Sequence, residues 1–212
     1  MDKKELQNPA LYTNRELSWL LFNKRVLSEA RDKQLLLFER LKFLSITASN
    51  LDEFFMVRIG SLVDMIHAEY TKKDIAGMSA KEQLDALMEE THKFAALQYS
   101  TYNRMLLPQL RANGLNFVEH HEQLTERQAQ YVDEYFEENV YPVLTPMAVD
   151  SSRPFPLIRN KTLNIGALVA KKGEKDTEIE FATVQVPSVL PRVVRIPAAK
   201  EGDTEVAVLL LE

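Results

Sequence analysis

An amide and two acids stand close together in the middle of residues 39–60, in the order Asn50, Asp52 and Glu53. The acid pair could bind a metal ion or transfer a proton. The apolar residues on either side recur with the i, i+3, i+4 spacing of buried helices, which predicts two helices that meet at Ser49 and Asn50. Either residue could cap the second helix, whose dipole would favour acids in the first turn. On the residues alone, we predict a capped helix start here and not a catalytic centre.

The histidines do not have the spacing of a metal site. None has a metal-like partner at i+3 or i+4 on an apolar face. The adjacent pair at 120 and 121 lies in a charged connector, where solvated side chains are expected. The four histidines are His67, His92, His120 and His121. No catalytic residue and no metal ligand is therefore predicted within this chain.

A basic cluster surrounds the Pro-Phe-Pro loop at residues 154–156. Arg153, Arg159 and Lys161 could grip phosphate groups, and a solvated loop explains them equally well. The chain has neither the glycine-rich phosphate and dinucleotide loops nor the Gly-x-Ser-x-Gly turn of serine hydrolases. The residues alone thus predict a protein without a self-contained catalytic centre.

Composition narrows the class of protein. The 212 residues are enough for one large or two small domains. The 26 basic and 31 acidic residues are interspersed and give a net charge of −5, which argues against non-specific nucleic-acid binding. The chain has no cysteine, no apolar run long enough for a transmembrane helix and no apolar signal-peptide core. We therefore expect a soluble, cytoplasmic protein without a transmembrane segment.

The elements that must position Asn50 are predicted to be helices. Residues 13–16, Thr-Asn-Arg-Glu, read as a capping box that opens a helix ending near Ala30, and the lone Trp19 in it is expected to pack. The second helix of the central pair is expected to run to about Tyr70.

A second capping box at residues 79–82, Ser-Ala-Lys-Glu, opens a long helix. Pro108 is expected to bend or end that helix, and Asn113-Gly114 to supply a left-handed stop. Residues 1–113 are thus predicted to form an all-α helical bundle of about four helices.

Residues 114–212 are predicted to mix α and β. A strand at 115–118 precedes a third capping box, at 125–128, whose helix ends at Tyr141-Pro142. Strand-like runs then follow at 163–169 and 179–186, with a polar turn at 171–177 between them. The runs at 193–196 and 206–211 are expected to be two further strands or a strand and the start of a helix. Because the chain stops inside an apolar run, we expect a truncated domain and an α+β multidomain fold overall.

Several uncommon motifs occur in order along the chain and together resemble one family, the bacterial polyphosphate kinases of the first type. They are Glu16-Leu17-Ser18-Trp19-Leu20, Phe22-Asn23-x-Arg25-Val26-Leu27, Glu39-Arg40-Leu41-Lys42-Phe43-Leu44, Asn50-Leu51-Asp52-Glu53-Phe54-Phe55-Met56-Val57-Arg58, Pro154-Phe155-Pro156 and Leu163-Asn164. The resemblance covers nearly the whole chain.

This resemblance implies a large, four-domain, homodimeric enzyme that reversibly transfers the terminal phosphate of ATP onto inorganic polyphosphate through a phosphohistidine. The present chain would be its N-terminal helical domain followed by part of its α/β head domain. In the family, the phosphohistidine and the magnesium ligands lie in two C-terminal domains that resemble phospholipase D. No histidine here inherits that role, and the fragment alone is expected to be inactive. The parent enzyme is expected to be cytoplasmic, with or without peripheral association with the membrane.

The resemblance also assigns one functional residue, because the asparagine of the family's Asn-Leu-Asp-Glu-Phe motif contacts the nucleotide and corresponds to Asn50. An amide suits adenine, since its carbonyl accepts from the amino group while its NH2 donates to a ring nitrogen. Ser49 would then take the helix cap. Arg153 stands where the family commonly has histidine, so the basic loop is left without an assigned role. The alternative hypothesis is a helical interaction and dimerisation module with no ligand of its own.

Overall fold

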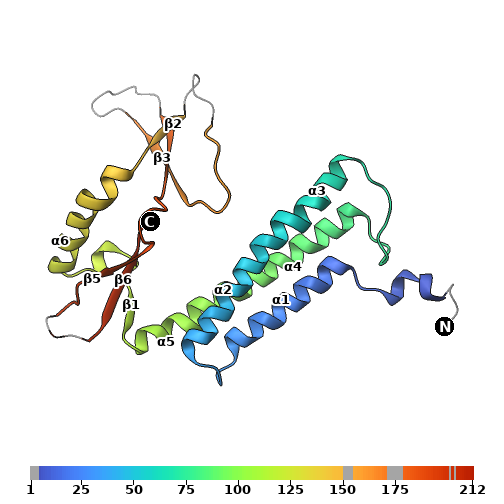
Figure 1. Ribbon diagram of the computed structural model, residues 1–212, viewed down its shortest axis with the longest axis horizontal. Coiled ribbons are helices and arrows are strands. Elements are labelled where there is room, and N and C mark those ends of the chain that lie inside the picture. Colours follow the sequence, from blue (N-terminus) through green and yellow to red (C-terminus); the bar gives the residue numbers. More distant parts are fainter. Residues whose placement is uncertain (1–4, 150–154, 171–178, 201, 203) are drawn as a thin grey trace. The chain divides into compact units, whose positions relative to one another are not determined.

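The computed structural model describes residues 5–149, 155–170, 179–200, 202 and 204–212. Arg153 and the polar turn predicted at 171–177 lie outside these residues. The chain divides into two compact units, Met1–Ala112 and Asn113–Glu212, each of which is described by itself (Figure 1).

The first unit is built from helices that lie alongside one another. Helices α1 (Arg15–Arg31), α2 (Leu37–Phe54) and α4 (Ala80–Thr101) run side by side, while α3 (Gly60–His67) continues α2 and α5 (Leu107–Ala112) continues α4 (Figure 1). Two clusters of buried apolar side chains join α1 to its neighbours. The first contains Leu20, Phe54, Ile59, Leu62, Ala80 and Leu87, and the second contains Leu27, Ala30 and Phe94. The predicted all-α unit is confirmed.

The helix break predicted at Ser49 and Asn50 is wrong. Helix α2 runs through both positions, and the irregular turn comes later, as a π-helical segment at Phe55–Ile59. The Asn50 side chain donates to Asn23 of α1 at 3.1 Å and does not cap a backbone N–H. A short polar side chain caps a helix when no other hydrogen-bond partner is in reach. Here Asn23 of a neighbouring helix is in reach and binds the Asn50 side chain instead. Neither Ser49 nor Asn50 is therefore a helix cap.

The first helix starts one residue later than the capping box at 13–16 predicts. Asn14 is the N-cap, and its Oδ1 accepts from the backbone N–H groups of Glu16 and Leu17 at 3.0 and 2.9 Å. Its Nδ2 donates to Asp74 at 2.7 Å and to Gln83 at 2.9 Å. These tertiary bonds, which the local pattern does not contain, explain why Asn14 replaces Thr13 as the cap.

The capping boxes predicted at Ser79 and Thr125 are confirmed. At the first, the Glu82 carboxylate accepts from the Ser79 backbone N–H at 2.7 Å, and this bond lowers the pKa of Glu82. A carboxyl with a lowered pKa in the folded state stabilises it above the unfolded pKa, and this contribution is lost as pH falls through the folded pKa. The cap of α4 is therefore expected to weaken in acid.

Replacing Ser79 by alanine is expected to lower the free energy of unfolding of the helical unit by about 1 kcal/mol, because the N-cap acceptor is lost. Urea denaturation followed by the fluorescence of Trp19, the only tryptophan, measures this change. Ser45→Ala on the exposed side of α2 is the control, and its free energy of unfolding should fall by less than half as much. Equal losses in the two variants would contradict the capping role.

Pro108 does not end the long helix. A π-helical segment at Tyr102–Leu106 comes directly before α5, and Pro108 is the second residue of α5. The wider turn accommodates a residue that has no N–H to donate and whose ring crowds the preceding turn. The stop after it is confirmed, since Gly114 has a φ of +80°, which favours glycine.

The second unit contains two three-stranded sheets. In one, β1 (Leu115–Phe117) pairs in parallel with β6 (Val206–Leu210), which pairs antiparallel with β5 (Val193–Ile196). In the other, β4 (Glu180–Gln185) lies between β2 (Met147–Val149) and β3 (Asn164–Val169), and both pairings are antiparallel. The predicted strands are confirmed, and the last two runs are both strands, with no helix start in either. Strand β2 falls in a proline-rich passage for which no strand is predicted.

One helix packs against the first of these sheets. Helix α6 (Glu126–Tyr135) continues as a π-helical segment at Phe136–Val140 and ends in a 3₁₀ turn at Tyr141–Val143. The buried Gln128 side chain donates to the Pro197 carbonyl, just beyond β5, at 2.8 Å. The predicted α+β character of the chain is thus confirmed.

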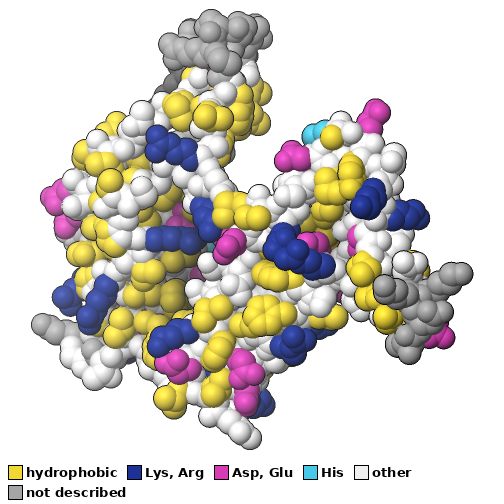
Figure 2. Space-filling model, turned by 45° about the vertical axis from the view of Figure 1, so that its right-hand side comes forward, with side chains coloured by type: hydrophobic (Ala, Val, Ile, Leu, Met, Phe, Trp, Pro, Cys, Tyr) yellow, Lys and Arg dark blue, Asp and Glu magenta, His cyan; other side chains and the backbone are white. Residues whose placement is uncertain are grey.

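The distribution of charged side chains on the surface agrees with the interspersed charges of the sequence. On the face shown in Figure 2, basic, acidic and apolar side chains are mixed. Among the helices that the structure describes, none combines the length and the hydropathy needed to cross a lipid bilayer.

Candidate functional site

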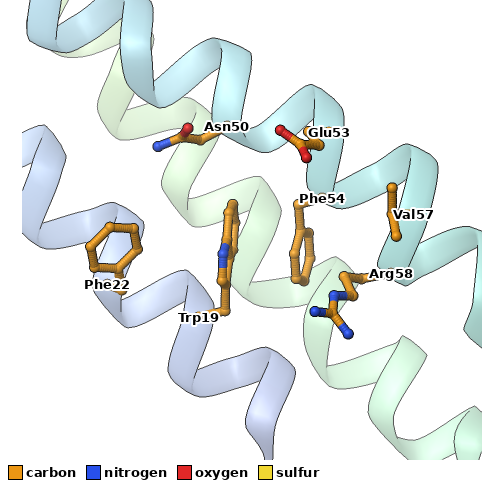
Figure 3. A pocket seen from close by; sticks show the side chains of 7 residues that line it. All are labelled: Trp19, Phe22, Asn50, Glu53, Phe54, Val57 and Arg58. Atoms are coloured by element: carbon orange, nitrogen blue, oxygen red, sulfur yellow. The ribbon is translucent and has the colours of Figure 1, made fainter.

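A surface pocket of about 240 Å³ lies between α1 and the α2 helix with its π-helical continuation. Seven side chains line it (Figure 3): Trp19, Phe22, Asn50, Glu53, Phe54, Val57 and Arg58. The residues from 50 to 58 reach one pocket because α2 passes without a break into the π-helical segment. The pocket therefore depends on the continuous helix that the sequence pattern does not predict.

Aromatic rings form the wall of the pocket. The Trp19 ring stacks on Phe54 with centroids 4.3 Å apart and planes inclined by 9°. Phe54 is only 2% exposed and belongs to the core, while Trp19 is half-buried. The other face of the Trp19 ring is turned toward Phe22, an exposed residue one helical turn along α1 (Figure 3). The predicted packing role of Trp19 is confirmed, and the same ring also offers a flat surface to a ligand.

Asn50 is half-buried at the edge of this aromatic wall, where a hydrogen-bond relay holds its amide. Its Nδ2 donates to Asn23 Oδ1 at 3.1 Å, and Asn23 Nδ2 donates to the Thr47 carbonyl at 3.1 Å. The Thr47 hydroxyl in turn accepts from Gln98 of α4 at 2.9 Å. Among the described residues, Asn23 is the side-chain partner of Asn50, which leaves Oδ1 and the second N–H of Asn50 for a ligand.

Asn23 is a site residue to which sequence reasoning gives no role. It lies in the buried stripe of α1 with Leu20, Leu27 and Ala30, and it is 0% exposed. The sequence did contain a signal for this role, since Asn23 occupies a position where the helical repeat would place an apolar residue. A polar group buried at such a position is normally held by specific hydrogen bonds.

Charged groups lie at the other end of the lining from Phe22 (Figure 3). Arg58 Nη1 is 3.8 Å from Glu16 Oε1, and the Arg58 side chain remains 41% exposed. Glu53 is exposed, and its neighbour Asp52 does not belong to the lining. Within the described residues, no group of three or more histidines and acids is placed to hold a metal ion. The structure therefore places Glu53, but not Asp52, in the pocket lining.

The other candidate residues are dispersed. His67 is the last residue of α3, His92 lies on the outside of α4, and all four histidines are exposed. Arg159 and Lys161 are exposed in the second unit, and the pocket belongs to the first. The structure therefore gathers Asn50 with aromatic residues and one arginine, and does not gather the histidines.

Two family models match the chain. The polyphosphate kinase N-terminal domain matches residues 12–118, and the polyphosphate kinase middle domain matches residues 127–212. The polyphosphate kinase of Lactiplantibacillus plantarum is 53% identical over 89% of this chain, and that of Halalkalibacterium halodurans is 47% identical over 91%. The chain spans 26% and 27% of the lengths of these two relatives.

A solved structure shows the same fold. The crystal structure of polyphosphate kinase from Porphyromonas gingivalis superposes with a TM-score of 0.80 and 30% identity, over 94% of this chain and 28% of that one. The helical unit and the strand-containing unit therefore follow one another along the chain as in that enzyme. Taken with the two family models, this shows that the chain belongs to the polyphosphate kinase family and comprises its N-terminal helical domain and part of its middle domain.

Proposed function

We propose that this chain is the nucleotide-binding part of an enzyme that reversibly transfers the terminal phosphate of ATP to inorganic polyphosphate, and that its aromatic pocket receives the adenine. The observation that carries the proposal is the Asn50 amide, held by Asn23 at the edge of a pocket walled by Trp19 and Phe22. Polyphosphate kinase relatives over most of the chain support the substrate class.

The chemistry of the pocket suits a purine base. Adenine offers an amino group that donates and ring nitrogens that accept, and the Oδ1 and second N–H of Asn50 match both. The exposed side of Trp19 and the Phe22 ring provide a stacking surface, and base–aromatic stacking is worth about 1–3 kcal/mol per base. Arg58, at the other end of the lining, is a partly exposed cation that could approach the phosphates.

The remaining chemistry is proposed to come from other domains. On the family resemblance, we propose that the phosphohistidine and the magnesium ligands lie outside residues 1–212. We therefore propose that residues 1–113 and 114–212 bind the nucleotide and contribute to a homodimer, and that they do not transfer phosphate on their own. The strand-containing unit would be the dimerisation part.

Asn50→Leu in a full-length polyphosphate kinase carrying this sequence is the test. Leucine keeps the size of the side chain and removes both its donor and its acceptor, so kcat/KM for ATP should fall about 10- to 100-fold, mostly through KM. Asn50→Asp, which keeps an acceptor and loses the donor, should show a loss of the same order. Steady-state kinetics at saturating polyphosphate measure both.

Ser49→Ala is the matched control, because Ser49 is the exposed neighbour of Asn50 on α2 and does not line the pocket. Its kcat/KM should stay within about twofold of the parent. If both Asn50 variants fold and keep the parent's KM for ATP, the adenine role is wrong. The interaction-module hypothesis would then be the better explanation of this domain.

A further inference from the structure

The buried amide of Asn23 has two partners, and their chemistry fixes its direction. Asn23 is 0% exposed in an apolar stripe, so leaving its donor or acceptor unpaired would be costly. Its Nδ2 lies 3.1 Å from the Thr47 carbonyl oxygen, which can only accept. Turning the amide over would place two acceptor oxygens against each other. Asn23 must therefore direct Oδ1, and not its NH2 group, toward Asn50.

The direction of Asn23 determines the direction of Asn50. Since Asn23 Oδ1 can only accept, Asn50 must present its NH2 group to it, as the 3.1 Å contact shows. The NH2 group and the carbonyl oxygen of an amide are attached to the same carbon in one rigid plane. Holding the NH2 group of Asn50 therefore also fixes the direction of its Oδ1. The Thr47 backbone carbonyl thus sets, through the buried Asn23 side chain, the directions in which Asn50 offers its Oδ1 and its remaining N–H to a ligand.

We propose that Asn23 is a positioning residue that makes this site prefer adenine over guanine, an inference that rests on the proposed nucleotide role of Asn50. Adenine presents an amino donor at the position where guanine presents a carbonyl acceptor. The fixed Oδ1 of Asn50 accepts from the amino group of adenine and opposes the carbonyl oxygen of guanine. Without Asn23, the Asn50 amide can rotate and donate to guanine instead.

A purely structural role for Asn23 makes a different prediction. If Asn23 only joined α1 to α2, its loss would weaken the fold and lower the activity with any nucleotide by a similar factor. The positioning role changes the ratio between two nucleotides. The ratio of kcat/KM for ATP to kcat/KM for GTP is therefore the readout that separates the two roles.

The experiment compares Asn23→Leu with the parent in the full-length enzyme, using ATP and GTP as donors at saturating polyphosphate. Leucine fills the same buried space and has no polar group, so it releases Asn50 without leaving a large cavity. A fixed amide is worth about 10- to 100-fold in base discrimination. In the variant, the ATP-to-GTP ratio should fall by at least about fivefold, with a gain for GTP and a change of about twofold or less for ATP.

Thr101→Val is the control for burial and lost polarity. Thr101 is also 0% exposed, its hydroxyl accepts from Arg31 at 2.8 Å, and it does not line the pocket. It should leave the ATP-to-GTP ratio unchanged even if the enzyme melts at a lower temperature. Should Asn23→Leu fail to fold, Asn23→Ala removes the same amide without adding bulk and carries the same expectation.

Two failures are distinguishable. An unchanged ATP-to-GTP ratio in a folded Asn23 variant, beside a large loss for ATP in Asn50→Leu, overturns the positioning role and leaves the adenine contact standing. Unchanged kinetics in both the Asn23 and the Asn50 variants overturn the proposed nucleotide function itself, and the inference with it. A shifted ratio in the Asn23 variant, beside a large loss for ATP in Asn50→Leu and an unchanged ratio in Thr101→Val, supports the inference.

Discussion

Replacing Phe54 by alanine is expected to lower the free energy of unfolding of the helical unit by about 3–5 kcal/mol, the range for a buried phenylalanine. Phe54 is 2% exposed and packs in the cluster that contains Leu20, Leu62 and Leu87. It is also the partner on which Trp19 stacks at 4.3 Å, and such a pair contributes about 0.5–1.5 kcal/mol beyond its buried area. The same change therefore weakens the core and removes the support of the pocket wall.

Phe38→Ala is the matched control, because Phe38 lies on the same helix and is 60% exposed. Urea denaturation followed by far-ultraviolet circular dichroism compares the two variants without depending on Trp19 itself. Phe38→Ala should change the free energy of unfolding by no more than about 0.5 kcal/mol, as for an ordinary surface residue. Losses of similar size in the two variants would show that Phe54 is not part of a close-packed core.

Arg40→Lys is expected to lower the free energy of unfolding by about 2–4 kcal/mol, even though it keeps the charge. Arg40 is 2% exposed, its Nε donates to the Ala30 carbonyl at 3.1 Å, and its Nη1 donates to Gln109 at 3.0 Å. Within the described residues no carboxylate pairs with it, and Nη2 has no hydrogen-bond partner. The opposing charge is the negative end of the α1 dipole, since Ala30 lies in the last turn of that helix.

The geometry explains why lysine is a poor substitute. A guanidinium can reach α1 and α5 at once with a rigid fork, whereas an ammonium on a flexible stem holds one of them and stays charged in an apolar site. Arg40→Met loses both hydrogen bonds but also removes the cost of burying a charge, so its loss should be smaller, at about 1–2 kcal/mol. Denaturation of both variants provides the comparison. A lysine variant as stable as the parent would show that only the charge of Arg40 matters.

Much of the fold could be predicted from local signals. The capping boxes at Ser79 and Thr125 were predictable because each partner lies within three residues of the other. The positive φ at Gly114 was predictable for a similar reason, since it depends on the residue itself. The strand runs of the second unit were also recognisable, apart from β2, whose short segment is defined only by its pairing with β4.

The wrong predictions share one cause. Asn14 became the cap in place of Thr13 because Asp74 and Gln83, some 60 and 69 residues away, bind its amide. Asn50 did not start a helix because Asn23, 27 residues earlier, takes its side chain. Local propensity for a cap contributes about 1 kcal/mol, so a tertiary hydrogen bond of similar strength can override it.

By itself, the sequence determined the helical character of residues 1–113, the mixed character of residues 114–212 and the resemblance that singles out Asn50. Only the tertiary structure decided that α2 continues through Asn50, that Trp19 and Phe54 stack to form a wall beside it, and that Asn23 sets the direction of its amide. The physical reason is that backbone periodicity is encoded over neighbouring residues, whereas the orientation of a polar side chain depends on which group another helix brings within 3.1 Å.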